Sequence, residues 1–149
     1  MIQFPDIEAT LVRFLKAQGV AASTKVPTTP PAQFATVWRT GGARFNPVTE
    51  NALVDVEAWG SSQGAARALG ERLRGLFAER TGIEANVKRV GEVGGLANLP
   101  DPDSNHHRYV FTAEFRIRGV TVLMSPLLTS TPPPAAGIIT PGRPPKSTT

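Results

Sequence analysis

Apolar residues recur every three or four positions in two stretches of the chain, which is the spacing of one face of an α-helix. In residues 6–18 these positions are Ile7, Leu11, Phe14 and Leu15. In residues 64–80 they are Ala66, Leu69, Leu73, Leu76 and Phe77. Gly19 follows the first stretch and Gly82 the second, each where a helix would end. The pattern predicts two helices that each turn one apolar face toward a core.

Alternating apolar and polar positions, the period of a half-buried strand, fill residues 34–39 and residues 109–118. The second run is the cleanest in the chain, and we expect it at the centre of a sheet. A shorter strand is predicted over residues 87–93. Residues 20–26 should form an edge strand or an exit loop, because prolines, which cannot donate to a sheet ladder, follow directly.

The stretch FATVWRTGGARFNPVTENALVDVEAWG, residues 34–60, predicts a hairpin that leads into the second helix. Gly41 and Gly42, followed by Asn46 and Pro47, mark the turn between its two strands. The glycines lack the spacing of a phosphate-binding loop, so we interpret them as a turn.

The returning strand of this hairpin has two different faces. Val54, Val56 and Ala58 would lie on a core face, and Asp55 and Glu57 on the opposite, acidic face. The two carboxylates could be imagined as a general acid and base, but the sequence shows no pocket around them. We therefore expect a solvent-facing or channel-facing pair.

Together these elements predict an α+β domain over residues 1–124. We expect a mostly antiparallel or mixed sheet of about four to five strands, with two main helices packed on one face and a loop over residues 94–105. From residue 125 onward the chain holds seven of its 14 prolines and little charge. Residues 125–149 are expected to be an extended or disordered Pro-rich C-terminal arm, either laid on a neighbouring subunit or serving as a short linker.

Composition excludes several classes of protein. A chain of 149 residues with 40% hydrophobic residues fits one domain with a modest core. It has no cysteine, so disulfides, thiolate metal sites and cysteine nucleophiles are excluded. No run reaches the roughly 18 apolar residues of a membrane span, and no signal peptide is recognisable, so we expect a soluble protein without a membrane partner. The net charge of +4 permits contact with nucleic acid but comes from scattered residues.

His106 and His107, close to Asp101 and Asp103, are the nearest approach to a metal site. Adjacent residues of an extended segment point to opposite faces, and no third ligand has suitable spacing. No serine lies in a nucleophile elbow. We therefore expect no metal, no cofactor and no enzymatic activity.

A series of short motifs runs through most of the chain. The first half holds prolines in residues 27–31, the turn RTGG at residues 39–42, the strand VDVEAW at residues 54–59, and a helix striped with Ala and Leu at residues 65–77. The second half holds Gly94-Gly95, Pro100-Asp101-Pro102, and a strand that begins with Arg108-Tyr109 and ends at Arg118-Gly119. In order and spacing, these motifs resemble the tail terminator (tail completion, head–tail joining) proteins of siphophages, the phages with long non-contractile tails, particularly those of actinobacterial phages. The resemblance covers nearly all of residues 1–119.

The resemblance implies a structural virion protein made in the host cytoplasm and located at the junction of tail and neck. Such a protein forms a ring of six subunits that caps the tail tube, ends tube polymerisation and provides the surface for head–tail joining. Its implied partners are further copies of itself, the major tail tube protein and a stopper or head-completion protein of the neck. Genomic DNA would pass through the lumen without sequence-specific binding.

Two groups of residues are candidates for these roles. Asp55 and Glu57 are assigned to the channel. The candidates for the subunit or tube interface lie in or beside the two predicted loops: Arg39, Gly41, Gly42, Arg44, Asn46, Asp101, Asp103 and Arg108.

Two other hypotheses remain open from the sequence. Another neck protein, such as a stopper or head-completion factor, fits the same composition. A basic DNA-binding module is the alternative from a different class, and its signature would be a steep fall of binding with salt.

Overall fold

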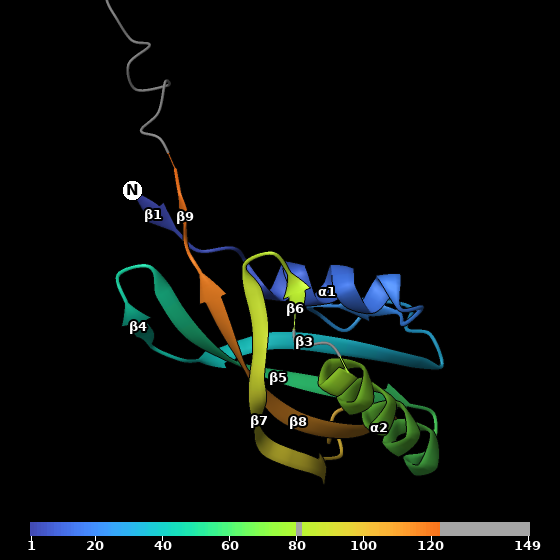
Figure 1. Ribbon diagram of the computed structural model, residues 1–149. Helices are drawn as coiled ribbons and strands as arrows, with labels where there is room; N and C mark the ends of the chain where they lie inside the picture. Colours follow the sequence, from blue (N-terminus) through green and yellow to red (C-terminus); the bar gives the residue numbers. More distant parts are fainter. Residues whose placement is uncertain (80–81, 123–149) are drawn as a thin grey trace, which may run out of the picture. The chain divides into compact units, whose positions relative to one another are not determined.

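The computed structural model of the chain describes residues 1–79 and 82–122 (Figure 1). Within them, Ile2–Val120 form one compact unit that carries the main sheet and both helices. Two strands of two residues each, β1 (Ile2–Gln3) and β9 (Val120–Thr121), lie outside the main sheet. The predicted arm, residues 125–149, lies outside the described residues.

The main sheet has seven strands in the order β2-β3-β5-β8-β7-β6, with β4 also paired to β5. They are β2 (Ala22–Ser23), β3 (Gln33–Gly41), β4 (Arg44–Asn46), β5 (Thr49–Gly60), β6 (Gly82–Glu84), β7 (Val87–Asn98) and β8 (His107–Arg118). The pairing of β2 with β3 is parallel, and the other pairings are antiparallel. The mixed, mostly antiparallel sheet is therefore confirmed. So is the central position of β8, which lies between β5 and β7.

Both predicted helices are present, α1 (Ile7–Ala17) and α2 (Gln63–Glu79). The carboxylate of Asp6 accepts hydrogen bonds from the first backbone N–H groups of α1, and the hydroxyl of Ser62 accepts one from Ala65. These caps satisfy N–H groups that have no partner inside a helix.

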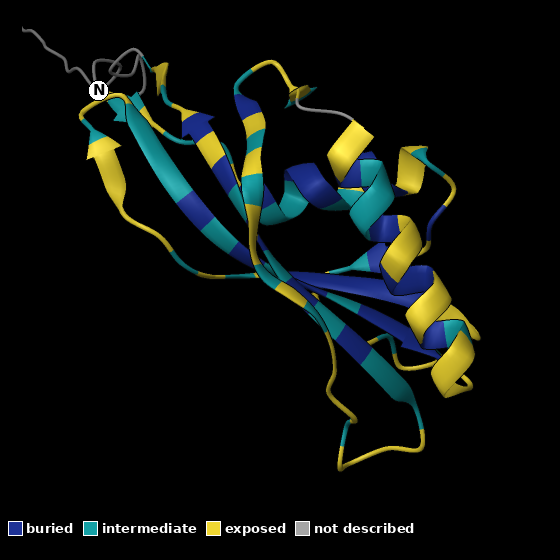
Figure 2. Cartoon of the chain, turned by 60° about the horizontal axis from the view of Figure 1, so that its bottom comes forward, coloured by how far each residue is buried: buried dark blue, intermediate teal, exposed yellow. Residues whose placement is uncertain are grey.

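The hydrophobic core lies between the two helices and one face of the sheet. Phe14 of α1 stacks on Phe77 of α2, with ring centroids 5.5 Å apart, and Phe77 meets Phe111 and Phe115 of β8 edge-on. Val54 and the alternate residues of β5 complete this layer, as the alternation predicts. Figure 2 shows buried residues along the sides of the strands and helices that meet. Both helices therefore share one core on one face of the sheet.

The opposite face of the sheet carries no helix in the part of the chain that the structure describes. We call it the helix-free face. It is formed by the alternate residues of the long strands: Phe34, Thr36 and Trp38 of β3; Leu53, Asp55, Glu57 and Trp59 of β5; and Arg108, Val110, Thr112, Glu114 and Arg116 of β8. An antiparallel sheet commonly leaves one face to solvent or to a partner.

Two expectations about the strands were wrong. The edge strand expected in residues 20–26 is present as β2, but the sheet has seven strands, not four to five, because β4 and β6 are only three residues long and such pieces show no measurable period. The expected loop over residues 94–105 is shorter, since β7 continues through Gly94 and Gly95 to Asn98. Three register shifts in its pairing with β8 accommodate these glycines, which the sequence suggested as a break.

Candidate interaction surfaces

The strand register separates the predicted interface residues into two groups at opposite ends of the main sheet. Thr49 of β5 lies opposite Arg118 of β8, and Gly60 lies opposite His107. One end therefore contains the connection from β3 through β4 to β5, and we call it the 40–49 end. The other contains the loop between β7 and β8, and we call it the 99–106 end; both are visible in Figure 2. Twelve residues of β5 separate them, a span of roughly 40 Å.

At the 40–49 end, the backbone is shaped by a glycine and an asparagine. Gly42 has a φ of 107°, in the left-handed region, and a Cβ there would collide with the carbonyl oxygen of Asn51. The side chain of Asn46 accepts a hydrogen bond from the N–H of Val48 at 2.9 Å, which closes the turn around Pro47. Gly42 and Asn46 are thus required by the turn itself.

The two arginines predicted at an interface at this end have different surroundings. Arg39 donates to the Glu50 carboxylate at 2.9 Å and to the carbonyl of Gly41 at 3.1 Å. Arg44 is exposed, and its guanidinium lies over the ring of Phe4, 5.0 Å from the centroid. Arg39 therefore contributes to the fold of the hairpin, while Arg44 remains available to a partner.

At the 99–106 end, Asp101 organises the loop. The backbone N–H of Asp103 and the hydroxyl of Ser104 donate to its carboxylate at 3.0 and 2.8 Å, and these bonds hold the pKa of Asp101 below its usual range. The side chain of Asp103 is exposed. The loop thus presents Asp103 at the surface while Asp101 fixes its shape.

Arg108, predicted at an interface, is held by three groups of its own chain. It donates to the Glu57 carboxylate at 3.1 Å and to the carbonyl of Leu99 at 2.8 Å. Its guanidinium also lies 5.2 Å from the centroid of the Trp59 ring. Arg108 therefore joins the loop to β5 on the helix-free face.

Asp55 and Glu57 both lie on the helix-free face, as the alternation predicts, and both are half-buried. Thr112 donates to Asp55 at 2.6 Å, and Thr36 and Arg108 donate to Glu57 at 2.7 and 3.1 Å. Glu57 is therefore neutralised by Arg108, whereas Asp55 faces a neutral hydroxyl. Of the two residues assigned to a channel, Asp55 contributes more unpaired negative charge.

The two tryptophans of this face differ in exposure. Trp59 is buried, stacks on Phe34 with centroids 5.5 Å apart, and donates through its indole N–H to Thr36 at 2.9 Å. Trp38 keeps half of its surface exposed. His106 packs edge-on against Phe34 and Trp59. Trp59 thus anchors a small aromatic cluster, whereas Trp38 is an exposed large apolar side chain of this face.

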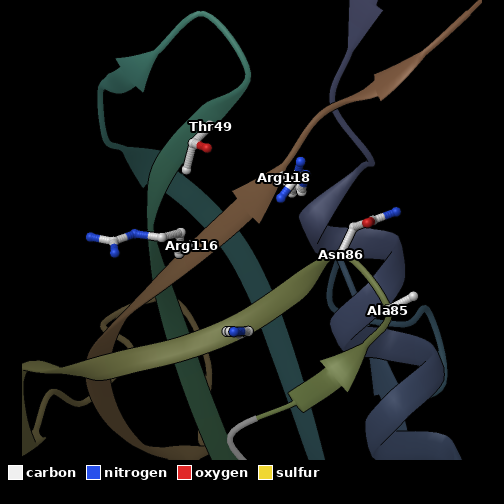
Figure 3. A pocket seen from close by; sticks show the side chains of 6 residues that line it. Thr49, Ala85, Asn86, Arg116 and Arg118 are labelled. Atoms are coloured by element: carbon white, nitrogen blue, oxygen red, sulfur yellow. The ribbon is translucent and has the colours of Figure 1, made fainter.

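Three cations that the sequence analysis treated as scattered come together at the 40–49 end. Lys88 lies directly opposite Arg116, and Arg118 is two residues further along β8. With three neighbouring residues they line a cavity of about 300 Å³ (Figure 3): Thr49, Ala85, Asn86, Lys88, Arg116 and Arg118. The alternation of β8 signals that Arg116 and Arg118 share a face, but only the register brings Lys88 to them.

Ion pairs connect both helices to β6 and β7, the strands at one edge of the sheet. Arg13 of α1 pairs with Glu84 of β6 at 3.1 Å. Arg74 of α2 pairs with Glu92 of β7 at 2.7 Å and with Glu71 at 2.9 Å. The hydrogen bond from Arg74 lowers the pKa of Glu92.

Among residues 1–79 and 82–122, no group of three His, Asp or Glu side chains is placed to hold a metal ion. Neither helix of this part is long and apolar enough to cross a membrane.

Comparison with known proteins adds no relative. No protein-family model matches the sequence, and no curated protein is significantly similar to it.

Proposed function

We propose that this protein is a structural virion protein that forms a ring on the end of a phage tail tube, ends tube polymerisation and joins the tail to the head. The motifs that resemble siphophage tail terminators suggest this function. The observation that carries it furthest is the division of the predicted interface residues between two opposite and chemically different ends of one sheet.

A capping ring needs two different axial surfaces, one for the tube and one for the neck. The 40–49 end carries Arg44 and the cations around Arg116. The 99–106 end carries Asp101 and Asp103. Two loop-bearing ends of opposite charge, fixed roughly 40 Å apart by continuous strands, suit such a role.

Ring closure needs two different lateral surfaces, because a head-to-tail contact joins unlike patches. β6 pairs with β7 only at Val87 and Lys88, so residues 89–98 form one outer edge of the sheet. Among the described residues, β2 pairs with β3 at Ala35 and Thr36 and the Glu8 carboxylate accepts the backbone N–H of Arg39, so the end of β3 beyond β2 forms the other edge and α1 covers part of it. Exposed strand edges are templates for pairing with another chain. These two unlike edges would meet between neighbouring subunits.

The middle of the helix-free face, around Asp55, would then line the lumen, whereas the cations near Arg116 lie at the 40–49 end of that face. Asp55 supplies unpaired negative charge in the middle of that face, which would discourage passing DNA from adhering. Glu57 would add less, because Arg108 neutralises it.

The test is electron microscopy of particles assembled in the absence of this protein. We expect filled heads beside unjoined tails of abnormal, uncontrolled length, because nothing would stop tube growth. Supplying the full chain in trans should restore both tail length and joining.

Two outcomes would contradict the proposal. Tails of normal length that lack only attachment to heads would indicate a stopper or head-completion factor. Intact particles would remove the protein from the neck altogether.

A further inference from the structure

We propose that the cavity at the 40–49 end is a site for the phosphate backbone of nucleic acid, bound without sequence preference by Lys88, Arg116 and Arg118. We call these three residues the cation cluster. The site goes beyond the tail-capping function and does not depend on it, because a free subunit already carries all three side chains.

The register forces the cation cluster together. Lys88 and Arg116 are direct cross-strand partners between β7 and β8, a position where side chains start roughly 4.5–5.5 Å apart. Arg118 follows on the same face of β8. Like charges placed directly opposite each other destabilise a sheet. A bound anion would offset the repulsion between Lys88 and Arg116 and would explain why two cations occupy these positions.

No side-chain carboxylate of the described residues forms an ion pair with the cation cluster. None of the five ion pairs among residues 1–79 and 82–122 involves the cation cluster. The nearest acidic residue along β8, Glu114, makes no ion pair with it. Residues 80–81 and 123–149, which the structure does not describe, contain no Asp or Glu side chain. The positive charge of the cation cluster is therefore left for an external anion.

One member of the cation cluster is held ready for a ligand. The Nε of Arg116 donates to the side-chain oxygen of Asn51 at 3.2 Å. Its guanidinium lies over the ring of Phe45, 5.0 Å from the centroid. These contacts orient the guanidinium and leave its two terminal amino groups free to donate among the described residues. Thr49 and Asn86 add a hydroxyl and an amide to the cavity lining (Figure 3).

The exposure of the site favours a polymer over a single small anion. All three cations are exposed, and an isolated ion pair in water contributes only about 0–1 kcal/mol. Nucleic acid gains much more from the same contacts, because each neutralised phosphate releases condensed counterions. The cation cluster therefore suits a polyanion of high charge density.

The test measures binding of the full chain to a short fluorescent DNA duplex of random sequence over a range of salt concentrations. The variant replaces Lys88, Arg116 and Arg118 by Gln. The matched control replaces Lys16, Lys25 and Arg67 by Gln, three exposed cations elsewhere that make no ion pair with the described residues. Both triple variants lose the same net charge.

Each phosphate contact contributes roughly 0.9 to the magnitude of the slope of log K against log salt. We therefore expect the cluster variant, which loses three contacts, to have a slope smaller in magnitude by about 2.7. Over a fourfold rise in salt, the affinity of the unsubstituted protein should therefore fall about 40-fold more than that of the cluster variant. The single change Arg118→Gln should lower the slope by about 0.9, and thermal unfolding verifies that each variant is folded. The control triple should keep the slope of the unsubstituted protein.

Three results would overturn the site. An equal loss in both triple variants would mean that only net charge matters. Displacement of the duplex by polyglutamate at the same concentration of charge would assign the cation cluster to an acidic protein partner. Displacement by inorganic phosphate at the same concentration of phosphate groups would assign it to free phosphate.

Discussion

Thr36 connects three side chains on the helix-free face through a single hydroxyl. It accepts the indole N–H of Trp59 at 2.9 Å and donates to the Glu57 carboxylate at 2.7 Å. Glu57 in turn holds Arg108. Thr36 is almost fully buried, so no water can substitute for it. The position of Arg108 therefore depends on a residue that has no charge of its own.

Replacing Thr36 by Val keeps the side-chain shape and removes the hydroxyl. We expect the free energy of unfolding to fall by about 1–3 kcal/mol, because the Trp59 N–H is left buried without an acceptor. Chemical denaturation of both proteins measures the difference. Thr40→Val is the matched control: Thr40 is exposed and its hydroxyl makes one longer bond of 3.3 Å, so a change within about 0.5 kcal/mol is expected. Equal losses at both positions would contradict the role of Thr36.

The pair of Arg74 and Glu92 makes stability depend on pH. The pKa of Glu92 is lowered by its hydrogen bond from Arg74, so the folded state favours the ionised carboxylate. The stabilisation is present above the ordinary Glu pKa of about 4.3 and is lost as the pH falls through the lowered value. We expect Glu92→Gln to be less stable than the unsubstituted protein at neutral pH and equally stable in acid.

Urea denaturation at several pH values measures this difference. Glu79→Gln is the control, since Glu79 lies on α2, the helix that carries Arg74, and makes no ion pair with the described residues. A Glu92→Gln deficit that persists unchanged in acid would show that lost packing, not the ion pair, is responsible.

At the scale of elements, the passage from β5 into α2 is the tightest join in the fold. Gly60 ends β5, and a Cβ on it would lie 2.6 Å from the backbone nitrogen of Ala66 in the first turn of α2. The three nearest atoms all belong to the backbone of Ala65 and Ala66, which leaves little room to adjust. By contrast, a Cβ on Gly75, further along the same helix, would meet nothing within 4 Å.

The same substitution should therefore have opposite effects at these two glycines. We expect Gly60→Ala to lower the free energy of unfolding by about 1–3 kcal/mol through overpacking. Gly75→Ala should raise it by about 0.5–1 kcal/mol, because alanine loses less conformational entropy in a helix. Thermal or chemical unfolding of the two variants measures both changes in the free energy of unfolding. Loss of stability in both would mean that α2 does not tolerate a side chain at Gly75, contrary to the open space there.

At the scale of the whole molecule, the two ends of the main sheet should be separable by mutation. If one end contacts the tube and the other the neck, charge reversal at the two ends should cause different defects. We expect one of Arg44→Glu and Asp103→Lys to give tails of abnormal length. The other should give tails of normal length that fail to join heads.

Electron microscopy of particles assembled with each variant provides the measurement. Arg67→Glu, on the exposed side of α2, is the matched control and should assemble normally. The same defect from both variants would contradict the assignment of separate partners to the two ends.

Local sequence patterns were sufficient for the long elements. The apolar stripe of Leu11, Leu69 and their neighbours predicted both helices, and the alternation around Val54 and Phe111 predicted the long strands with the correct core face. Periodicity is a property of neighbouring residues, so it can be read without knowing what the element packs against. Strands such as β4 and β6 have no period, because pairing with a long neighbour creates them.

The sequence by itself therefore determined the two helices, the long strands β3, β5 and β8, the side of the sheet that carries the core, and the turn around Gly42 and Asn46. Only the tertiary structure decided which charges meet. It paired Arg39 and Arg108 with carboxylates of their own chain, and it brought Lys88 to Arg116 with no carboxylate beside them. The physical reason is range: backbone conformation and amphipathic spacing are local, whereas contacts between side chains depend on strand register across residues far apart in the sequence.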